Sequence, residues 1–160
     1  MNERLSFLEP EALRWREVTG DYSRNYFVRH DYTILGHDLT AGTLDMLVRW
    51  HGDGGHCPLH RHTATTSILV LDGEQHVRDR LDDGTLGPER IRRAGEHALL
   101  TAERYAHLEC GGPDGGLAFF GCHTDNGSLY EIVDDEGNVV FDVTIESLLA
   151  DFDEHMGIAP

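Results

Sequence analysis

The sequence has few basic residues and no long apolar segment. Its 160 residues contain 13 Lys and Arg against 29 Asp and Glu, a formal net charge of −16 with neutral histidines. A negative surplus of this size argues against binding to nucleic acid or to anionic membrane surfaces. No segment approaches the roughly 20 apolar residues of a membrane span, and the first residues have no apolar stretch of signal-peptide length. We therefore expect a cytoplasmic protein with neither kind of partner.

Cysteine is scarce as well. The chain has three cysteines, Cys57, Cys110 and Cys122, and none of them forms a C-x-x-C pair. An odd number of separated cysteines predicts reduced thiols, as in a cytoplasm. The sequence also lacks a phosphate-binding glycine loop and the G-x-S-x-G motif around a nucleophilic serine. Nucleotide binding through such a loop and serine-hydrolase chemistry are therefore not indicated.

Glycine, by contrast, is frequent, and 18 glycines separate short apolar segments. Residues 43–50 have apolar side chains at every second position, which is typical of a strand with one buried face. Residues 65–77 predict a hairpin that turns at Asp72-Gly73, and residues 129–143 predict a second one that turns at Glu136-Gly137-Asn138. Further short strands are predicted at residues 96–102, 106–110 and 116–123, with the stretch GGPDGG as a loop between the last two.

The C-terminal segment changes to a helical period. Residues 144–157 predict a helix with Thr144 as its N-cap, and its apolar stripe consists of Ile145, Leu148, Leu149, Phe152 and Met156. The first 14 residues are interpreted as an N-terminal arm with a short helix near Pro10. Many short strands and one final helix favour an all-β fold for a single domain of residues 1–160, a barrel or sandwich of two antiparallel sheets.

Two histidines, His60 and His62, lie one residue apart before an apolar segment. With 11 histidines in 160 residues, chance alone gives about 0.75 such pairs, so the spacing by itself is weak evidence. In a strand, however, both side chains share one face with Thr66 and Ile68, and that face becomes apolar. Buried imidazoles need a partner, and neutral imidazole is a good ligand for iron, zinc, copper and nickel. A metal site is therefore favoured over a pair of surface histidines.

The spacing of these residues resembles the cupin family. Gly54, His60, His62 and Gly73 match every spacing of the first cupin motif, but Thr66 occupies the position of the motif's glutamate. The second motif is less well kept. Gly95 opens it and His107 fits its histidine one residue late, while its usual proline, glycine and asparagine are missing. The stretches PLHRH and DDEGNV are similar to single-domain cupins related to acetylacetone dioxygenase and 2,4′-dihydroxyacetophenone dioxygenase.

The resemblance implies a cupin jelly-roll barrel in which His60, His62 and His107 bind a divalent metal. Iron(II) is the expected ion, with Zn²⁺ or Ni²⁺ as alternatives, because the acetylacetone dioxygenase branch uses three histidines and ferrous iron. Three neutral imidazoles leave the double charge of the ion uncompensated and up to three coordination positions open. Such a centre suits an anionic chelating substrate. Thr66 would then lie behind the ligands and bond to a water or a substrate oxygen.

The resemblance further implies a dioxygenase that cleaves a carbon–carbon bond of a small enolisable ketone or β-diketone with O₂. Two alternatives are a regulatory cupin without catalysis, similar to those of anti-sigma factors, and a sugar-binding or isomerase cupin. Cupins commonly pair through sheet edges, so we expect a homodimer.

Several polar residues near the motifs remain open in role. Glu103 is the second candidate catalytic residue after Thr66. Together with Arg104 it lies in a loop that either covers the pocket or forms a plain surface ion pair. His56 and Cys57 are candidate ligands or rim residues, and Glu74 is a candidate base or an exposed turn residue.

Overall fold

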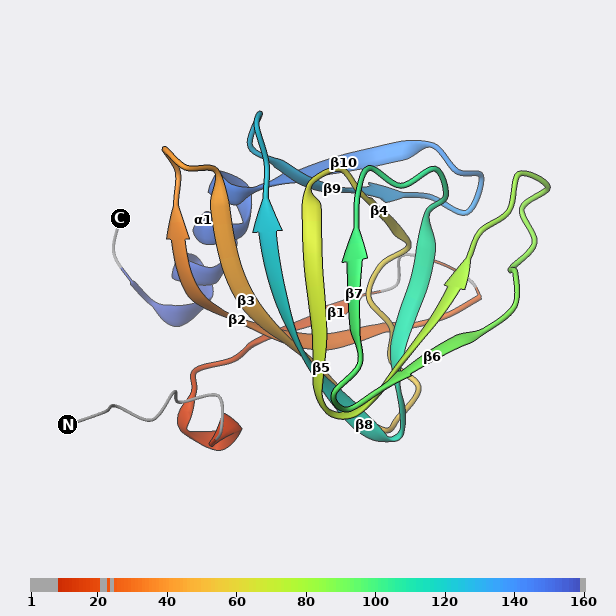
Figure 1. The fold of residues 1–160 in the computed structure, drawn as a ribbon, viewed down its shortest axis with the longest axis horizontal. Coiled ribbons are helices and arrows are strands. Elements are labelled where there is room, and N and C mark those ends of the chain that lie inside the picture. The colour runs from red at the N-terminus through yellow and green to blue at the C-terminus, as the bar shows by residue number, and fades with distance from the viewer. Residues whose placement is uncertain (1–8, 21–22, 24, 159–160) are drawn as a thin grey trace.

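The computed structural model describes residues 9–20, 23 and 25–158, and most of them lie in β-strands (Figure 1). A 3₁₀ turn at Pro10–Ala12 precedes the strands, and the helix α1 (Ile145–Met156) follows them. The strands are β1 (Arg16–Gly20), β2 (Val28–Asp38), β3 (Thr43–Trp50), β4 (His60–His62), β5 (Thr65–Asp79), β6 (Arg90–Arg93), β7 (His97–Leu100), β8 (His107–His123), β9 (Ser128–Val133) and β10 (Val139–Thr144).

The ten strands form one sheet that curls into a barrel, because the long strands β5 and β8 bend and run through both halves (Figure 1). In one half the order is β1-β2-β3-β8-β5-β7, and in the other it is β10-β9-β4-β8-β5-β6. These neighbours pair antiparallel throughout. The predicted barrel of two antiparallel sheets is confirmed, with the difference that two strands belong to both sheets.

The interior of the barrel is apolar. The alternating face predicted for residues 43–50 is confirmed, since Leu44, Met46, Val48 and Trp50 of β3 are all buried. They pack with Ile68 of β5, Phe120 of β8 and other buried side chains in one core cluster. The inward side of β4, by contrast, carries the buried side chains of His60 and His62.

The predicted hairpin at Asp72-Gly73 is wrong, because β5 continues through these residues as one strand. Gly73 has a positive φ of 63°, which kinks the strand. A Cβ at this position would lie 2.4 Å from the carbonyl oxygen of Gly115. The pairing of β5 with β8 shifts here, from Gly73 opposite Gly116 to Gln75 opposite Gly111. Residues 112–115 thus project from β8 as a bulge, in the place where the sequence predicted a loop between two strands.

The helix predicted at the C-terminus is present. The Thr144 side chain accepts a hydrogen bond from the Ser147 backbone N–H, and the Ser147 side chain accepts one from the Thr144 N–H, so both free donors are satisfied. Gly157 ends the helix in the left-handed region. The helix buries Ile145 and Leu148 and packs outside the barrel, against β1, β2 and β10 (Figure 1).

At the other end of the chain, the short helix expected near Pro10 is a single 3₁₀ turn, whose Pro10 carbonyl accepts a hydrogen bond from the Trp15 indole at 2.7 Å. Residues 1–8 of the expected N-terminal arm lie outside the described residues. Among the helices of the described segments, none is long and apolar enough to cross a membrane.

Candidate metal centre

Three histidines meet on the inner side of the barrel. His60 and His62 lie on β4, and His107 is the first residue of β8, directly opposite His60 in the ladder. One ring nitrogen of each lies within 4.8 Å of the others, and all three side chains are buried. The structure therefore brings together the three residues that the sequence singled out as ligands.

The alternation of β4 places both of its histidines inward. Arg61, between them, points to the outside, where its guanidinium pairs with the Glu131 carboxylate of the neighbouring β9. The strand does not continue unbroken into β5 as the sequence suggested, since residues 63–64 separate the two. The alternation nevertheless survives the break, because Thr66, Ile68 and the histidines are all buried on the same side.

The hydrogen bonds of the rings leave metal-binding nitrogens free. Nδ1 of His60 lies 2.7 Å from the carbonyl oxygen of Pro58, which can only accept, so this nitrogen carries the proton and Nε2 keeps its lone pair. Nε2 of His62 is buried without a partner among the described residues. A buried nitrogen of this kind costs free energy unless something binds it. The site therefore fits a divalent cation.

Thr66 lies beside His62, away from the free nitrogen. Its fully buried hydroxyl is 3.3 Å from Nδ1 of His62 and 3.2 Å from the carbonyl oxygen of Ala64. The consistent arrangement is that Nδ1–H of His62 donates to the Thr66 oxygen and the Thr66 hydroxyl donates to Ala64. In this arrangement Thr66 fixes the orientation of a candidate ligand, whereas the sequence predicts contact with a bound water or substrate.

Glu103 connects two of the histidines. Its carboxylate accepts a hydrogen bond from the backbone N–H of His62 at 2.9 Å and lies 3.3 Å from Nδ1 of His107. The next residue, Arg104, points to the surface and pairs with Asp82 at 2.9 Å, with both side chains 74% exposed. Glu103 thus lies against two of the clustered histidines, and Arg104 forms a surface ion pair.

The protonation of the rings follows from their burial and their neighbours. Burial lowers the pKa of His60 and that of His62, and their positive neighbours lower them further, so both rings are neutral, as metal binding requires. Burial also lowers the pKa of His107, but the carboxylates of Glu103 and Glu109 outweigh it, and the net pKa is raised.

Glu109 is the residue of the site that sequence analysis missed. It follows His107 by two positions on the same face of β8 and is only 3% exposed. One carboxylate oxygen lies 3.4 Å from Nε2 of His60, and the other accepts a hydrogen bond from Gln75 at 2.7 Å. Burial raises the pKa of Glu109, but the two histidines and the hydrogen bonds from Gln75 and Cys57 together outweigh it, and the net pKa is lowered. Glu109 and His107 are two positions apart, as His60 and His62 are, and this spacing is the sequence feature that could have predicted its place in the site.

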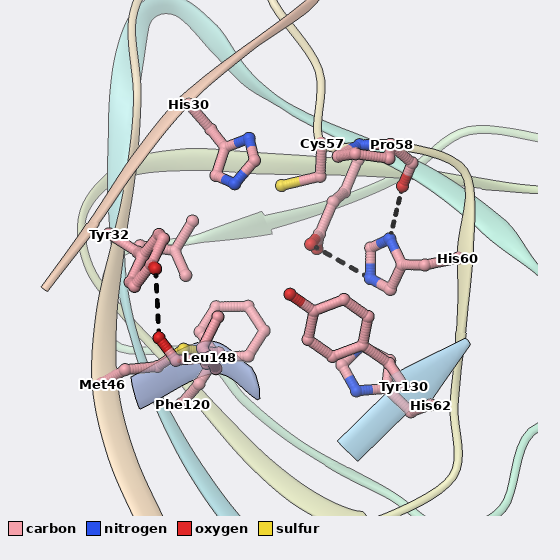
Figure 2. Close-up of a pocket in the computed structure, with 12 residues that line it drawn as sticks. His30, Tyr32, Met46, Cys57, Pro58, His60, His62, Phe120, Tyr130 and Leu148 are labelled. Atoms are coloured by element: carbon pink, nitrogen blue, oxygen red, sulfur yellow. Dashed lines mark hydrogen bonds and ion pairs between the residues drawn. The ribbon is translucent and has the colours of Figure 1, made fainter. Parts of the chain in front are cut away.

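A small cavity of about 40 Å³ lies beside the histidines. Figure 2 shows His30, Cys57, His60 and Tyr130 arranged around it, with the Tyr130 hydroxyl pointing inward. His62, Glu109 and Tyr32 add further polar groups to its walls, and the remaining lining residues are apolar. Several of the same residues, Tyr130 and His30 among them, also line a larger cavity of about 490 Å³, which lies between β1, β2, β9, β10 and α1. Together the two cavities form a pocket that leads from the barrel edge to the histidines.

The remaining candidates take different positions. Cys57 lines the small cavity, and burial raises the pKa of its thiol well above the usual value, so it is protonated. His56 is half-buried next to Tyr26, with ring centroids 5.7 Å apart. Glu74 pairs with His76 and Arg93, and does not line the pocket.

Comparisons with known proteins identify the fold. The sequence matches no protein-family model and no curated protein. Among solved structures, a candidate acetylacetone dioxygenase from Methylibium petroleiphilum PM1 superposes with a TM-score of 0.68 at 12% identity, over 95% of this chain and 94% of that chain. An RmlC-like cupin from Ralstonia eutropha JMP134 gives 0.64 at 17% identity, over 92% and 85%.

An acetylacetone dioxygenase from Acinetobacter johnsonii gives a TM-score of 0.58 at 12% identity, over 84% of each chain. Identities at this level establish the fold alone. The chain therefore has the cupin jelly-roll fold with a C-terminal helix, and its structural neighbours include acetylacetone dioxygenases.

Proposed function

We propose that this cupin is a metal-dependent dioxygenase that cleaves a carbon–carbon bond of a small enolisable ketone or β-diketone with O₂. The observation that carries the proposal is the cluster of three buried histidines at the inner end of the pocket, in which Nε2 of His62 has no partner within the described part of the chain. The fold shared with acetylacetone dioxygenases supports it.

His60, His62 and His107 are the proposed ligands, and iron(II) is the proposed ion, with Zn²⁺ or Ni²⁺ as alternatives. When bound, a ferrous ion supplies the reactivity toward O₂ and the positive charge that holds a substrate anion. The protein contributes the orientation of the rings. The Pro58 carbonyl fixes His60, Thr66 fixes His62, and Glu103 lies beside His107.

Tyr130 is the proposed hydrogen-bond donor to the substrate. Burial raises the pKa of its hydroxyl, which therefore keeps its proton and can donate to the enolate oxygen. Its ring lies 5.3 Å from that of His60 and 6.1 Å from that of His62, so a molecule beside the histidines is within its reach. The apolar walls exclude water from the same space.

The larger cavity indicates a substrate with an apolar substituent. It is lined mainly by aliphatic and aromatic side chains, and its charged groups, Arg16 and Asp151, already pair with each other at 3.1 Å. Asp151 also accepts a hydrogen bond from Tyr32 at 2.5 Å. With these charges satisfied, the cavity offers an uncharged surface, which favours an alkyl or aryl group on the ketone.

Two accompanying features are also proposed. Reduced thiols at Cys57, Cys110 and Cys122, none of which forms a disulfide, support a cytoplasmic location. An exposed apolar strip on the edge strand β10 supports a homodimer. It consists of Val139, Val140 and Phe141, each about half exposed. The same strip would serve a partner protein if the chain is a regulatory cupin.

The test is oxygen consumption by protein loaded with Fe²⁺ under low oxygen and then mixed with a β-diketone. We expect the uptake of one O₂ per bond cleaved, and its loss in His60→Ala and in His107→Ala, because each variant leaves an incomplete ligand set. Activity should depend on added Fe²⁺. Iron-loaded protein that consumes no O₂ with any β-diketone or α-hydroxyketone would favour the regulatory alternative, and full metal binding by His107→Ala would exclude His107 as a ligand.

A further inference from the structure

Two hydrogen-bond acceptors, one on Glu109 and one on His60, lie close together in the site. Nδ1 of His60 donates to the Pro58 carbonyl, so Nε2 presents a lone pair. A carboxylate oxygen of Glu109 lies only 3.4 Å from this nitrogen, and both residues are at most 4% exposed. Two buried acceptors at this distance repel unless a proton or a metal ion lies between them.

A hydrogen bond on the side away from the histidines fixes the orientation of the Glu109 carboxylate. Gln75, fully buried on β5, donates its amide N–H to the second oxygen of Glu109 at 2.7 Å. The amide oxygen of Gln75 in turn accepts from the Arg92 guanidinium at 2.9 Å. A chain of hydrogen bonds thus runs from Arg92 to one oxygen of the carboxylate, and the Cys57 thiol is a further hydrogen-bond partner of Glu109. The other oxygen lies toward Nε2 of His60. Metal ligands are commonly held in this way by neighbouring groups.

We infer that Glu109 is the carboxylate ligand of the metal and replaces, from β8, the glutamate that the first motif lacks at Thr66. Neighbouring ligands at bond lengths of about 2.1 Å are separated by about 3 Å, and the 3.4 Å between Glu109 and His60 is close to this value. The inference rests on the proposed function only in assuming that a divalent metal occupies the three-histidine cluster.

The charge of the centre changes accordingly. Three neutral imidazoles and one carboxylate leave a divalent ion with a single positive charge, whereas the sequence had suggested a double one. A singly charged substrate enolate then makes the buried site neutral, which favours binding of one anion and disfavours a dianion.

The test compares Glu109→Gln with wild type by Co²⁺ titration, monitored by visible absorption, and by thermal unfolding with and without Co²⁺. Glutamine keeps the shape and removes the charge. We expect Co²⁺ affinity to fall at least tenfold, the Co²⁺ spectrum to change, and the metal-induced rise in Tm to shrink. The Tm of the metal-free protein should stay equal or rise, because a buried charge is removed.

Two controls separate the possible explanations. Glu103→Gln changes a carboxylate that lies behind His107, so its Co²⁺ spectrum should keep the wild-type shape. Glu74→Gln changes a carboxylate outside the pocket and should leave affinity and spectrum as in wild type. Wild-type affinity and spectrum in Glu109→Gln would overturn the inference, as would a fall in metal-free Tm with unchanged affinity. Wild-type protein that binds no Co²⁺ would instead overturn the proposed function and the inference with it.

Discussion

At the scale of single residues, the orientation of His62 depends on one hydroxyl group. Thr66 is the only side chain among the described residues whose polar atom lies within hydrogen-bonding distance of Nδ1 of His62. At the glutamate position of the cupin motif, Thr66 thus contacts the ring of a proposed ligand. A role in positioning, unlike a direct contact with substrate, predicts that metal affinity is the property most sensitive to this hydroxyl.

We predict that Thr66→Val lowers metal affinity about tenfold while the protein still folds. Valine keeps the size and branching of threonine, but it leaves the buried Nδ1–H of His62 without an acceptor. Competition with a chromophoric chelator measures the affinity, and circular dichroism checks the fold. The neighbouring Thr65 is exposed, so Thr65→Val is the matched control and should bind as wild type does. Equal affinity in the two variants would show that the hydroxyl is dispensable.

The residues of the site were partly predictable from the sequence. The sequence predicted the cluster of His60, His62 and His107, because residues two apart in a strand share a face and because the spacing of cupin motifs can be read from the sequence. The preference for a neutral His62 and the contact between Thr66 and Nδ1 could not be found, since they depend on ring orientation. Glu109 was overlooked because a carboxylate within a strand is usually solvent-exposed, and its burial depends on Gln75, which lies on another strand.

At the scale of elements, the bend in β5 decides the shape of the barrel. Alternation predicted β3, and turn residues predicted the β9–β10 hairpin, because both signals are local. Asp72-Gly73 indicated a reversal that does not occur. A glycine with positive φ suits both a tight turn and a kink, and which one forms depends on the bulge at residues 112–115 of β8, far away in the sequence.

We predict that Gly73→Ala destabilises the protein by more than about 2 kcal/mol, as judged from chemical denaturation. The added Cβ would lie 2.4 Å from the backbone oxygen of Gly115, in addition to the cost of about 1–2 kcal/mol for a positive φ. Gly127 is the control, because it has a φ of 86° and a Cβ added there would meet no heavy atom within 4 Å. Gly127→Ala should show the cost of φ alone. Equal losses in both variants would mean that β5 and β8 move apart easily.

At the scale of the whole molecule, the edge strand β10 presents apolar side chains to solvent. This strand carries the exposed Val140 and Phe141, which water solvates poorly, and β1 ends the strand order on the other side. An exposed apolar edge of this kind is suited to pairing with a second copy of the chain.

We predict that the protein is a homodimer through β10 and that Phe141→Glu makes it a monomer, because the added charges would be buried against each other. Light scattering at micromolar concentration measures the mass. Leu99 is 61% exposed on β7, away from β10, so Leu99→Glu should leave the dimer intact. A monomer mass for the wild-type protein would contradict the prediction.

The sharing of β5 and β8 between both halves has a consequence for how molecules reach the site. A barrel whose two sheets have common strands cannot open between them without breaking its longest ladders. The larger cavity, however, is bounded by β1 and β10, which end the strand order, and by α1, which packs on them from outside. We therefore expect small movements of α1 and β10, more than of the barrel wall, to control how molecules enter and leave the pocket.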